Sequence, residues 1–246
     1  MTIEIHDIHS DLYQNEKLKE IAAIVNAGSG SGGGGSGTSG GTTETGLKLI
    51  DHMVFGAGFM GVGAWSGATI TRITDEEDRF GVVSLNCGTG SGGFSWHIGD
   101  KLKIRAGDVV TFTFKTPATI EPTYTVRAGF ADSSAFANSC GFAIAGTTLT
   151  AIYRLSGAET ASASSYTVSP STWYRGVVEA GDTSTTVKIY RLDNTLLTEL
   201  TVNSTLMSTT RAPCIVATNS ATGTVRPIVL LDTVELNLVA RPFVLP

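Results

Sequence analysis

The chain has 246 residues, only 16% of them charged, and its formal net charge is −5. Soluble domains average about 25% charged residues and nucleic-acid-binding surfaces are basic, so this balance argues against a nucleic-acid partner. No window approaches the roughly 20 apolar residues of a membrane span. The polar N-terminus also lacks the basic start and apolar run of a secretion signal, so neither a membrane span nor secretion is expected.

Residues 1–27 are predicted to form an attachment segment that begins with a short strand. Ile3 and Ile5 alternate with polar residues. This alternation is typical of a strand that can add to a partner's sheet.

A helix is predicted to follow over residues 15–28, because Asp11 and Gln14 resemble an N-terminal cap. Leu18, Ile21 and Val25 have the 3-then-4 spacing of a coiled-coil seam. A helix of this length is marginal alone in water and needs a partner surface, either a sister chain or its own β-domain. We expect the three apolar residues to form an oligomer contact.

Residues 28–46 are predicted to be a linker. The run from Gly28 to Gly41 contains only Gly, Ser and one Thr, and little that can pack follows it up to Gly46. Such a stretch has no side chains to bury and is expected to behave as a flexible coil. The composition is also typical of engineered spacers between fused proteins, so a natural and an artificial origin both stay open.

Residues 47–246 predict one β-domain without a convincing helix. Strand candidates recur at intervals of about ten residues, and Val110, Phe112 and Phe114 illustrate the alternation of apolar and polar positions. The predicted strands are 47–55, 68–74, 79–86, 100–105, 108–115, 123–130, 140–146, 149–156, 173–181, 185–192, 196–202, 212–219 and 226–239. The fold is therefore expected to be mainly β, an antiparallel jelly-roll-like β-sandwich preceded by a short N-terminal helix and a Gly-rich linker.

Two patterns match known functional motifs only in part, because the neighbouring residues do not provide the structure that the function needs. Gly56, Gly58 and Gly61 match the dinucleotide motif GxGxxG, but β-branched residues follow where the motif needs a helix. The acidic run Asp75–Asp78 could hold calcium or supply carboxylates for glycoside hydrolysis, although adjacent acids more often mark a solvated turn.

His6, His9, His52 and His97 accompany neither a GxSxG nor an HExxH motif. We therefore expect no catalytic residue, no cofactor and no metal. Cys87, Cys140 and Cys214 lie in apolar, strand-like contexts without metal-ligand spacing, so they are predicted to be buried free thiols.

Four aromatic residues are candidates for stacking on sugar rings. Trp96 is flanked by glycines and is the better candidate for exposure, with Trp65 as a second. Trp173, beside Tyr174, begins a predicted strand and is more typical of an anchor at the edge of the core.

Three blocks in the second half of the chain carry a resemblance to a known family. They are DKLKIRAGDVVTFTFKTP, STWYRGVVEAGDTSTTVKIYRLDNTLLTEL and VLLDTVELNLVARP, at residues 100–117, 171–200 and 229–242. Together they resemble the concanavalin-like or jelly-roll domains of structural appendage proteins of tailed bacteriophages. The similarity covers about the last 150 residues and identifies a fold family better than a role.

The resemblance implies a non-enzymatic virion protein, assembled in the host cytoplasm and often a homotrimer. Residues 1–27 would attach to another virion protein, and residues 47–246 would be displayed as a short fibre, head fibre or decoration protein, with host surface glycan as a possible partner. Two alternatives stay open: a carbohydrate-active enzyme of the tailspike depolymerase type, and a protein that only stabilises the capsid.

Overall fold

A computed structural model describes eleven parts of the chain. These are residues 3–6, 47–51, 64–67, 69–73, 79, 82–88, 93–98, 103–133, 135–205, 210–220 and 228–239. The described residues form strands and connecting turns, and no helix occurs among them. They consequently contain no helix of the length and hydropathy that a membrane crossing requires.

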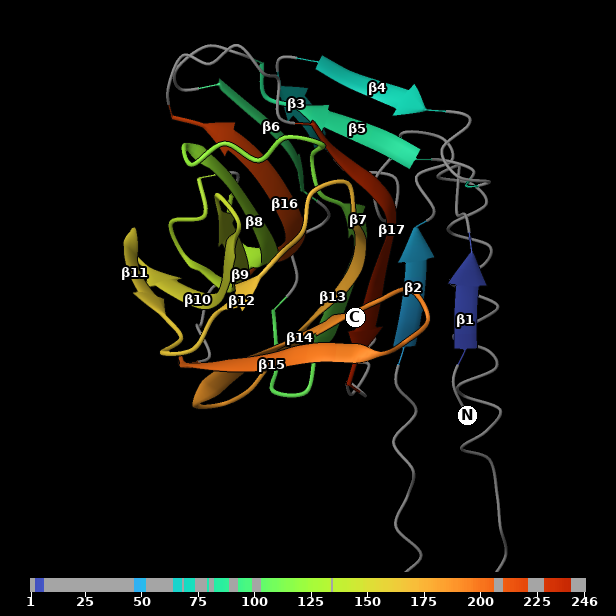
Figure 1. Cartoon of the computed structure of the whole chain (residues 1–246). Coiled ribbons are helices and arrows are strands. Elements are labelled where there is room, and N and C mark those ends of the chain that lie inside the picture. Colours follow the sequence, from blue (N-terminus) through green and yellow to red (C-terminus); the bar gives the residue numbers. More distant parts are fainter. Residues whose placement is uncertain are drawn as a thin grey trace, which may run out of the picture.

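The strands pack as two sheets, one with nine strands and one with eight (Figure 1). The nine-stranded sheet contains Ile3–His6 (β1), Leu47–Asp51 (β2), Thr69–Ile73 (β4), Val82–Asn86 (β5), Val109–Lys115 (β7), Trp173–Ala180 (β13), Ser184–Tyr190 (β14), Leu196–Asn203 (β15) and Ile228–Leu238 (β17). Its order is β1-β2-β17-β7-β13-β14-β15, with β5 pairing with β17 and β4 pairing with β5.

The eight-stranded sheet contains Ala64–Gly67 (β3), Gly93–Ile98 (β6), Tyr124–Ala131 (β8), Ser139–Ala145 (β9), Thr148–Leu155 (β10), Ala158–Ala161 (β11), Tyr166–Thr167 (β12) and Ala212–Asn219 (β16). Its order is β11-β10-β9-β8-β16-β6-β3, and β12 also pairs with β10. All pairings in this sheet are antiparallel. The prediction of a mainly β, two-sheet antiparallel sandwich is confirmed.

Aromatic side chains join the two sheets at the centre of the core. The Phe142 ring, from the eight-stranded sheet, stacks on Phe114 at 5.6 Å between ring centroids and meets Phe112 edge-on at 6.4 Å. Gly176 on β13 makes room for this ring, because a Cβ at that position would lie 2.8 Å from Phe142 Cε1. The apolar face predicted for residues 110, 112 and 114 is therefore the face that contacts the opposite sheet.

The outer face of β7 is less solvent-exposed than alternation alone predicts. Thr111 and Thr113 point away from the core, yet they are only 6% and 7% exposed. Their cross-strand partners are Val177 and Glu235 for Thr111, and Arg175 and Thr233 for Thr113. Each threonine has one long cross-strand neighbour, Glu235 for Thr111 and Arg175 for Thr113, so even the outer face is largely closed at its centre.

One strand prediction is corrected by the structure. The segment predicted at 100–105 is irregular over its described residues 103–105 and leads into a turn at Gly107, whose φ is +87°. The Asp108 carboxylate holds this turn by accepting hydrogen bonds from the backbone N–H groups of Arg105, at 2.8 Å, and Val239, at 3.0 Å. Local alternation did not reveal this long-range contact.

Conversely, residues 93–98 form strand β6, which the sequence analysis did not predict. The sequence analysis noted only that glycines flank Trp96 in this segment. The segment pairs along its length with β16, and residues 64–67 add a further strand, β3, beside it. Pairing with neighbours on both sides outweighs the low β-propensity of glycine.

The predicted N-terminal strand is present as β1, but its pairing differs from the expectation of a partner's sheet. It lies parallel to β2 of the same chain at the edge of the nine-stranded sheet (Figure 1). The predicted helix over residues 15–28 and the linker over residues 28–46 lie outside the described residues.

Candidate functional site

A hollow opens between the two sheets at the end of the sandwich where β13 ends and β14 begins. The space that a water-sized molecule can reach in it is about 10 Å3, and the empty volume of about 280 Å3 around it includes open solvent. Its lining residues come from both sheets and from the turns between strands: Ile104, Cys140, Tyr153, Ala180, Gly181, Thr185, Ser204, Thr205 and Arg211.

The eight-stranded sheet contributes a thiol and a phenol hydroxyl to the hollow. Cys140 on β9 and Tyr153 on β10 are directly opposite each other in the antiparallel register, so their side chains lie on the same face. Both are half-buried and pack against the core. Arg211, immediately before β16, is only 3% exposed and completes this side.

The nine-stranded sheet contributes three hydroxyl groups. Thr185 lies at the start of β14, and Ser204 and Thr205 follow the end of β15. Thr185 pairs with Val202 near that end, so the register brings the three hydroxyl-bearing residues close together. The hydroxyls of Thr185 and Ser204 are 3.0 Å apart and hydrogen-bonded. The turn at Gly181 is closed by a hydrogen bond from its N–H to the Ser184 carbonyl, at 2.8 Å.

One hydrogen bond links the two sides of the hollow. The Tyr153 hydroxyl and the Thr205 Oγ1 are 2.8 Å apart, and the two residues are 52 positions apart in the sequence. Either hydroxyl can donate. The pair can therefore turn one hydrogen or one lone pair toward a ligand, which suits a partner that both donates and accepts.

Charge near the hollow is balanced. Burial lowers the pKa of the Arg211 guanidinium, and the negative charge of the Asp132 carboxylate acts in the opposite direction. Its Nε donates to the Asn138 carbonyl at 3.3 Å. A buried cation is costly unless it is hydrogen-bonded and faces opposite charge, and Arg211 has both kinds of support.

Asp132, in the turn after β8, is the carboxylate that balances Arg211. Burial alone would raise the pKa of this carboxyl. Hydrogen bonds from the Asn138 side chain, the Asn138 backbone and Ser133, together with the charge of Arg211, lower it instead. The Asn138 Nδ2 donates to Asp132 Oδ2 at 2.6 Å. Asn138 thus hydrogen-bonds both Asp132 and Arg211 and holds these two charged residues in place beside the hollow.

The Cys140 thiol is unsuited to nucleophilic chemistry. Burial raises its pKa to about 11, although a hydrogen bond to Thr185 and the charge of Arg211 act in the opposite direction. The nucleophile is the thiolate, and near pH 7 this residue is a thiol. The lining of the hollow offers hydrogen-bonding groups and an apolar wall.

A second cluster of aromatic and cationic side chains lies on the outer face of the nine-stranded sheet. The guanidinium of Arg79 lies 4.6 Å from the centroid of the Trp173 ring, and Lys115 Nζ lies 5.9 Å from it. Arg79 also forms an ion pair with Asp232. Arg175 stacks over Tyr190 at 4.8 Å. These contacts use the aromatic faces within the protein, so the cluster is a weaker candidate for sugar stacking than the hollow.

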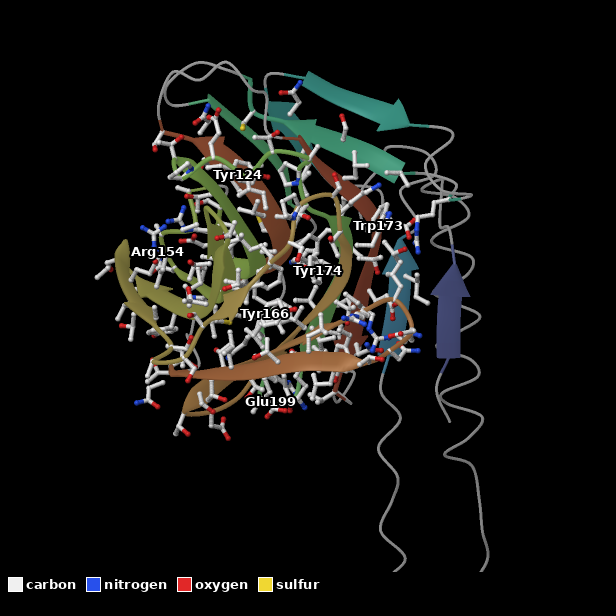
Figure 2. All side chains as sticks on the ribbon, in the orientation of Figure 1. Tyr124, Arg154, Tyr166, Trp173, Tyr174 and Glu199 are labelled. Carbon is white, nitrogen blue, oxygen red and sulfur yellow. The ribbon has the colours of Figure 1, made fainter. Side chains whose placement is uncertain are left out.

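Trp173 and Tyr174 point to opposite sides of β13 (Figure 2). Tyr174 faces the core, where its ring lies 6.0 Å from Phe114 and its hydroxyl accepts a hydrogen bond from the Ser169 N–H at 2.8 Å. Trp173 is 7% exposed and packs on the outer face. Trp173, the residue predicted to anchor the edge of the core, is thus buried on the outer face of the sheet, and its neighbour Tyr174 packs in the core.

The two predicted glycan-stacking residues, Trp96 and Trp65, lie on neighbouring strands of the eight-stranded sheet. Trp96 on β6 is opposite Val216 of β16 and Ser66 of β3, whereas Trp65 is opposite His97. They are therefore not cross-strand partners, and their side chains lie outside the described residues. Their role in stacking stays a prediction.

Several predicted residues fall outside the described part of the chain. They are Leu18, Ile21 and Val25 of the oligomer contact, Gly56, Gly58 and Gly61 of the GxGxxG match, the acidic run at 75–78, and His9 and His52. His6 and His97 belong to β1 and β6. Among the described residues, no three His, Cys, Asp or Glu side chains form a group that could hold a metal ion.

The three cysteines are free, with Cys87 and Cys214 buried and Cys140 half-buried. This confirms the prediction of free thiols. Sequence reasoning missed Tyr153, Thr205 and Arg211 as site residues, because these common residue types lie in three separate segments. The hydroxyl-rich run Asn203–Thr205 at a strand end was the one local signal available.

Comparisons with known proteins place this fold among sandwiches of lectin type. The crystal structure of SO2946, a protein of unknown function from Shewanella oneidensis MR-1, aligns over 98% of both chains with 17% identity and a TM-score of 0.68. The carbohydrate recognition domain of Emp47p aligns over 76% of this chain and 93% of its own, with 9% identity and a TM-score of 0.54.

The CBM2 module of the evolved Dit protein of Lactobacillus casei BL23 phage J-1 aligns over 78% of this chain and 96% of its own. The identity is 8% and the TM-score is 0.54. At these identities the likeness establishes a concanavalin-like β-sandwich fold. No curated protein matches the chain in sequence.

One family model matches the sequence itself. It is described as SO2946-like, C-terminal domain, and it matches residues 78–232, which include the described strands from β5 to β16. Because the match covers more than half of the chain, the protein belongs to the SO2946-like C-terminal domain family.

Proposed function

We infer that this protein is a non-enzymatic, glycan-binding virion protein of a tailed bacteriophage, displayed on the particle as a short fibre or decoration appendage. The observation that carries the binding part is the hollow in which hydroxyls from both sheets converge around Tyr153 and Arg211. The attachment part rests on residues 1–27 and the sequence resemblance.

The chemistry of the hollow supports a sugar ligand. The hydroxyls of Tyr153, Thr185, Ser204 and Thr205 can each donate or accept a hydrogen bond, as sugar hydroxyls can. The opposite charges of Arg211 and Asp132 balance, which suits a neutral ligand. The hollow has only about 10 Å3 of space for a water-sized molecule, so we expect the hydroxyls at its mouth to hydrogen-bond a single sugar hydroxyl while the rest of the glycan stays in solvent.

The fold supports the same proposal by analogy. A carbohydrate recognition domain and a phage Dit module align with this chain over three quarters of its length. A shared fold does not imply a shared site, so this analogy raises the expectation without locating the ligand. Weak binding at one hollow would become useful on a particle, because many displayed copies engage a surface together.

The first test is binding of host-type surface polysaccharides to the full chain and to Tyr153→Phe. This variant keeps the ring and loses the hydroxyl that bonds Thr205. A lost hydrogen bond of about 1 kcal/mol weakens binding about five-fold, which isothermal titration calorimetry resolves. Tyr190→Phe is the matched control, because it removes a hydroxyl from the outer face of the nine-stranded sheet and keeps the ring on which Arg175 stacks.

Two results would contradict a glycan site in the hollow. One is the absence of binding to every polysaccharide tested. The other is an equal loss of affinity in Tyr153→Phe and Tyr190→Phe, because an equal loss points to a general effect on the protein.

A depolymerase is distinguished from a binding protein by incubating the same polysaccharides with pure protein and assaying new reducing ends. A binding protein leaves their number constant. Accumulation of reducing ends would favour a depolymerase and overturn the non-enzymatic reading.

The virion part is tested by gold-labelled antibody against residues 47–246 on purified particles. Label at the tail supports receptor binding, and label over the head supports a head fibre or decoration role. If particles that lack the protein lose heat resistance but adsorb normally, the capsid-stabilising alternative replaces glycan binding. Absence of label from all particles would overturn the virion proposal.

A further inference from the structure

Strand β1 is attached to the fold in an unusual way. It pairs with β2 alone, at the edge of the nine-stranded sheet, over four residue pairs from Ile3 with Leu47 to His6 with Ile50. It is also the one parallel pair among the described strands, where every other pairing is antiparallel. A parallel pair is slightly weaker per residue than an antiparallel one, so four pairs hold the strand weakly.

The connection between the two strands is much longer than this pairing needs. A parallel crossover within one chain takes about a dozen residues. Residues 7–46 separate β1 from β2 here, and the run from Gly28 to Gly41 lies within them. A connection of this length can span at most about 130 Å when fully extended, several times the width of a small domain. The connection is thus long enough to reach the same edge on a neighbouring copy.

The free energy of pairing favours β2 of the same chain only weakly over β2 of a neighbouring copy. Closing a flexible loop costs more as its length grows, and a short tethered strand sees its own edge at an effective concentration of only millimolar order. Where two copies lie side by side, the β2 edge of the neighbour has an effective concentration similar to that of the chain's own edge. The same four pairs form in either arrangement, because every copy has the same edge.

We propose that β1 is an exchangeable strand, which adds in parallel to β2 of a second copy of this chain and links the copies by strand exchange. The receptor is the β2 edge from Leu47 to Ile50, and the donated segment is Ile3 to His6. Main-chain hydrogen bonds supply the attraction, as in other cases of strand addition to a sheet edge. The inference does not depend on the glycan hollow, which lies at the end of β13.

Disulfide trapping across the register tests this exchange directly. One copy carries Ile5→Cys and a differently tagged copy carries Leu49→Cys. These two positions are paired, so in neighbouring strands their Cα atoms are about 5 Å apart, within the usual range for a disulfide. After co-expression and mild oxidation, a non-reducing gel should show a mixed dimer that contains both tags.

A matched control pairs Ile5→Cys with Lys48→Cys, one residue out of register and on the opposite side of the pleat. It should give far less mixed dimer. A chain that carries both Ile5→Cys and Leu49→Cys then measures the competition, because pairing within one chain gives a fast-migrating monomer. We expect the interchain product to form beside this monomer, because the same four pairs are available in both arrangements.

Two outcomes would overturn the proposal: cross-linked monomer without mixed dimer, or equal mixed dimer from the in-register and out-of-register pairs. A second variant separates strand exchange from association through the predicted helix. Ile5→Pro removes an N–H group and disfavours β1 pairing. If light scattering finds the same mass for this variant as for the original chain, exchange does not hold the copies together.

Discussion

Glycine is required where β8 and β9 lie closest. Gly129 and Gly141 are directly opposite each other, and a Cβ on Gly141 would lie 2.1 Å from the Ala128 carbonyl oxygen. Backbone atoms cannot yield as a flexible side chain can. The close approach positions β9, and with it Cys140 beside the hollow, so the shape of the candidate site depends on a residue without a side chain.

The buried thiols make stability sensitive to alkali. Burial raises the pKa of Cys87 to about 11 from an ordinary value of 9.0, and it raises that of Cys214 well above its ordinary value. Below pH 9 the thiols are neutral in both the folded and the unfolded chain. Above it the unfolded chain loses protons first, so the free energy of unfolding falls as pH rises.

For Cys87, we expect a loss of about 2 kcal/mol in the free energy of unfolding between pH 9 and pH 11. Urea unfolding at a series of pH values should show a shallower decline for Cys87→Ala than for the original chain. The variant also leaves a small cavity, but that cost does not vary with pH. Parallel pH profiles for the two proteins would contradict the prediction.

At the scale of elements, the turn between β14 and β15 depends on a single left-handed residue. Asn194 has a φ of +67°, its N–H donates to the Arg191 carbonyl at 3.1 Å, and Arg191 donates to the Thr195 carbonyl at 2.9 Å. Asp193 Oδ1 accepts from the Thr195 N–H at 2.9 Å. This turn directs β15 back along β14, and the end of β15 supplies Ser204 and Thr205 to the hollow.

Asn194→Val should therefore lower the free energy of unfolding by about 1–2 kcal/mol, because a β-branched residue is strained at this φ. Asn194→Gly is the matched control and should change it by less than about 0.5 kcal/mol, because glycine adopts the same φ without a steric cost. Chemical denaturation measures both. Equal effects of the two variants would show that the backbone conformation is not the cause.

At the scale of the whole molecule, the described core belongs entirely to residues after the linker. Its first member is Ile50, and the rings that join the sheets come from β7, β9 and β13. Strand β1 adds four residue pairs at one edge. We therefore expect the sandwich to fold without residues 1–46.

A chain that begins at Leu47 should keep the far-ultraviolet circular dichroism of a β-protein and melt within about 4 °C of the full chain, because loss of the β1 pairs costs about 1 kcal/mol at most. Loss of the cooperative transition would show that the first 46 residues contribute to the core. The truncated chain should also fail to form the mixed disulfide dimer, because it has no strand to donate.

The fold class followed from local patterns. Alternation placed Val110, Phe112 and Phe114 on one buried face, and Val234, Leu236 and Leu238 on another. The apolar contexts of the cysteines predicted free thiols. These features are accessible from sequence because the side-chain period of a strand and the burial of its apolar face are properties of a few neighbouring residues.

The tertiary structure alone decided the features that depend on distant partners. Strand β6 exists because β16 and β3 pair with it, and Trp173 lies on the outer face because Tyr174 occupies the core. The hollow brings Tyr153 against Thr205 across 52 positions of sequence. Convergence of this kind is set by the register of long-range strand pairs and by how the two sheets meet, and no local periodicity encodes either.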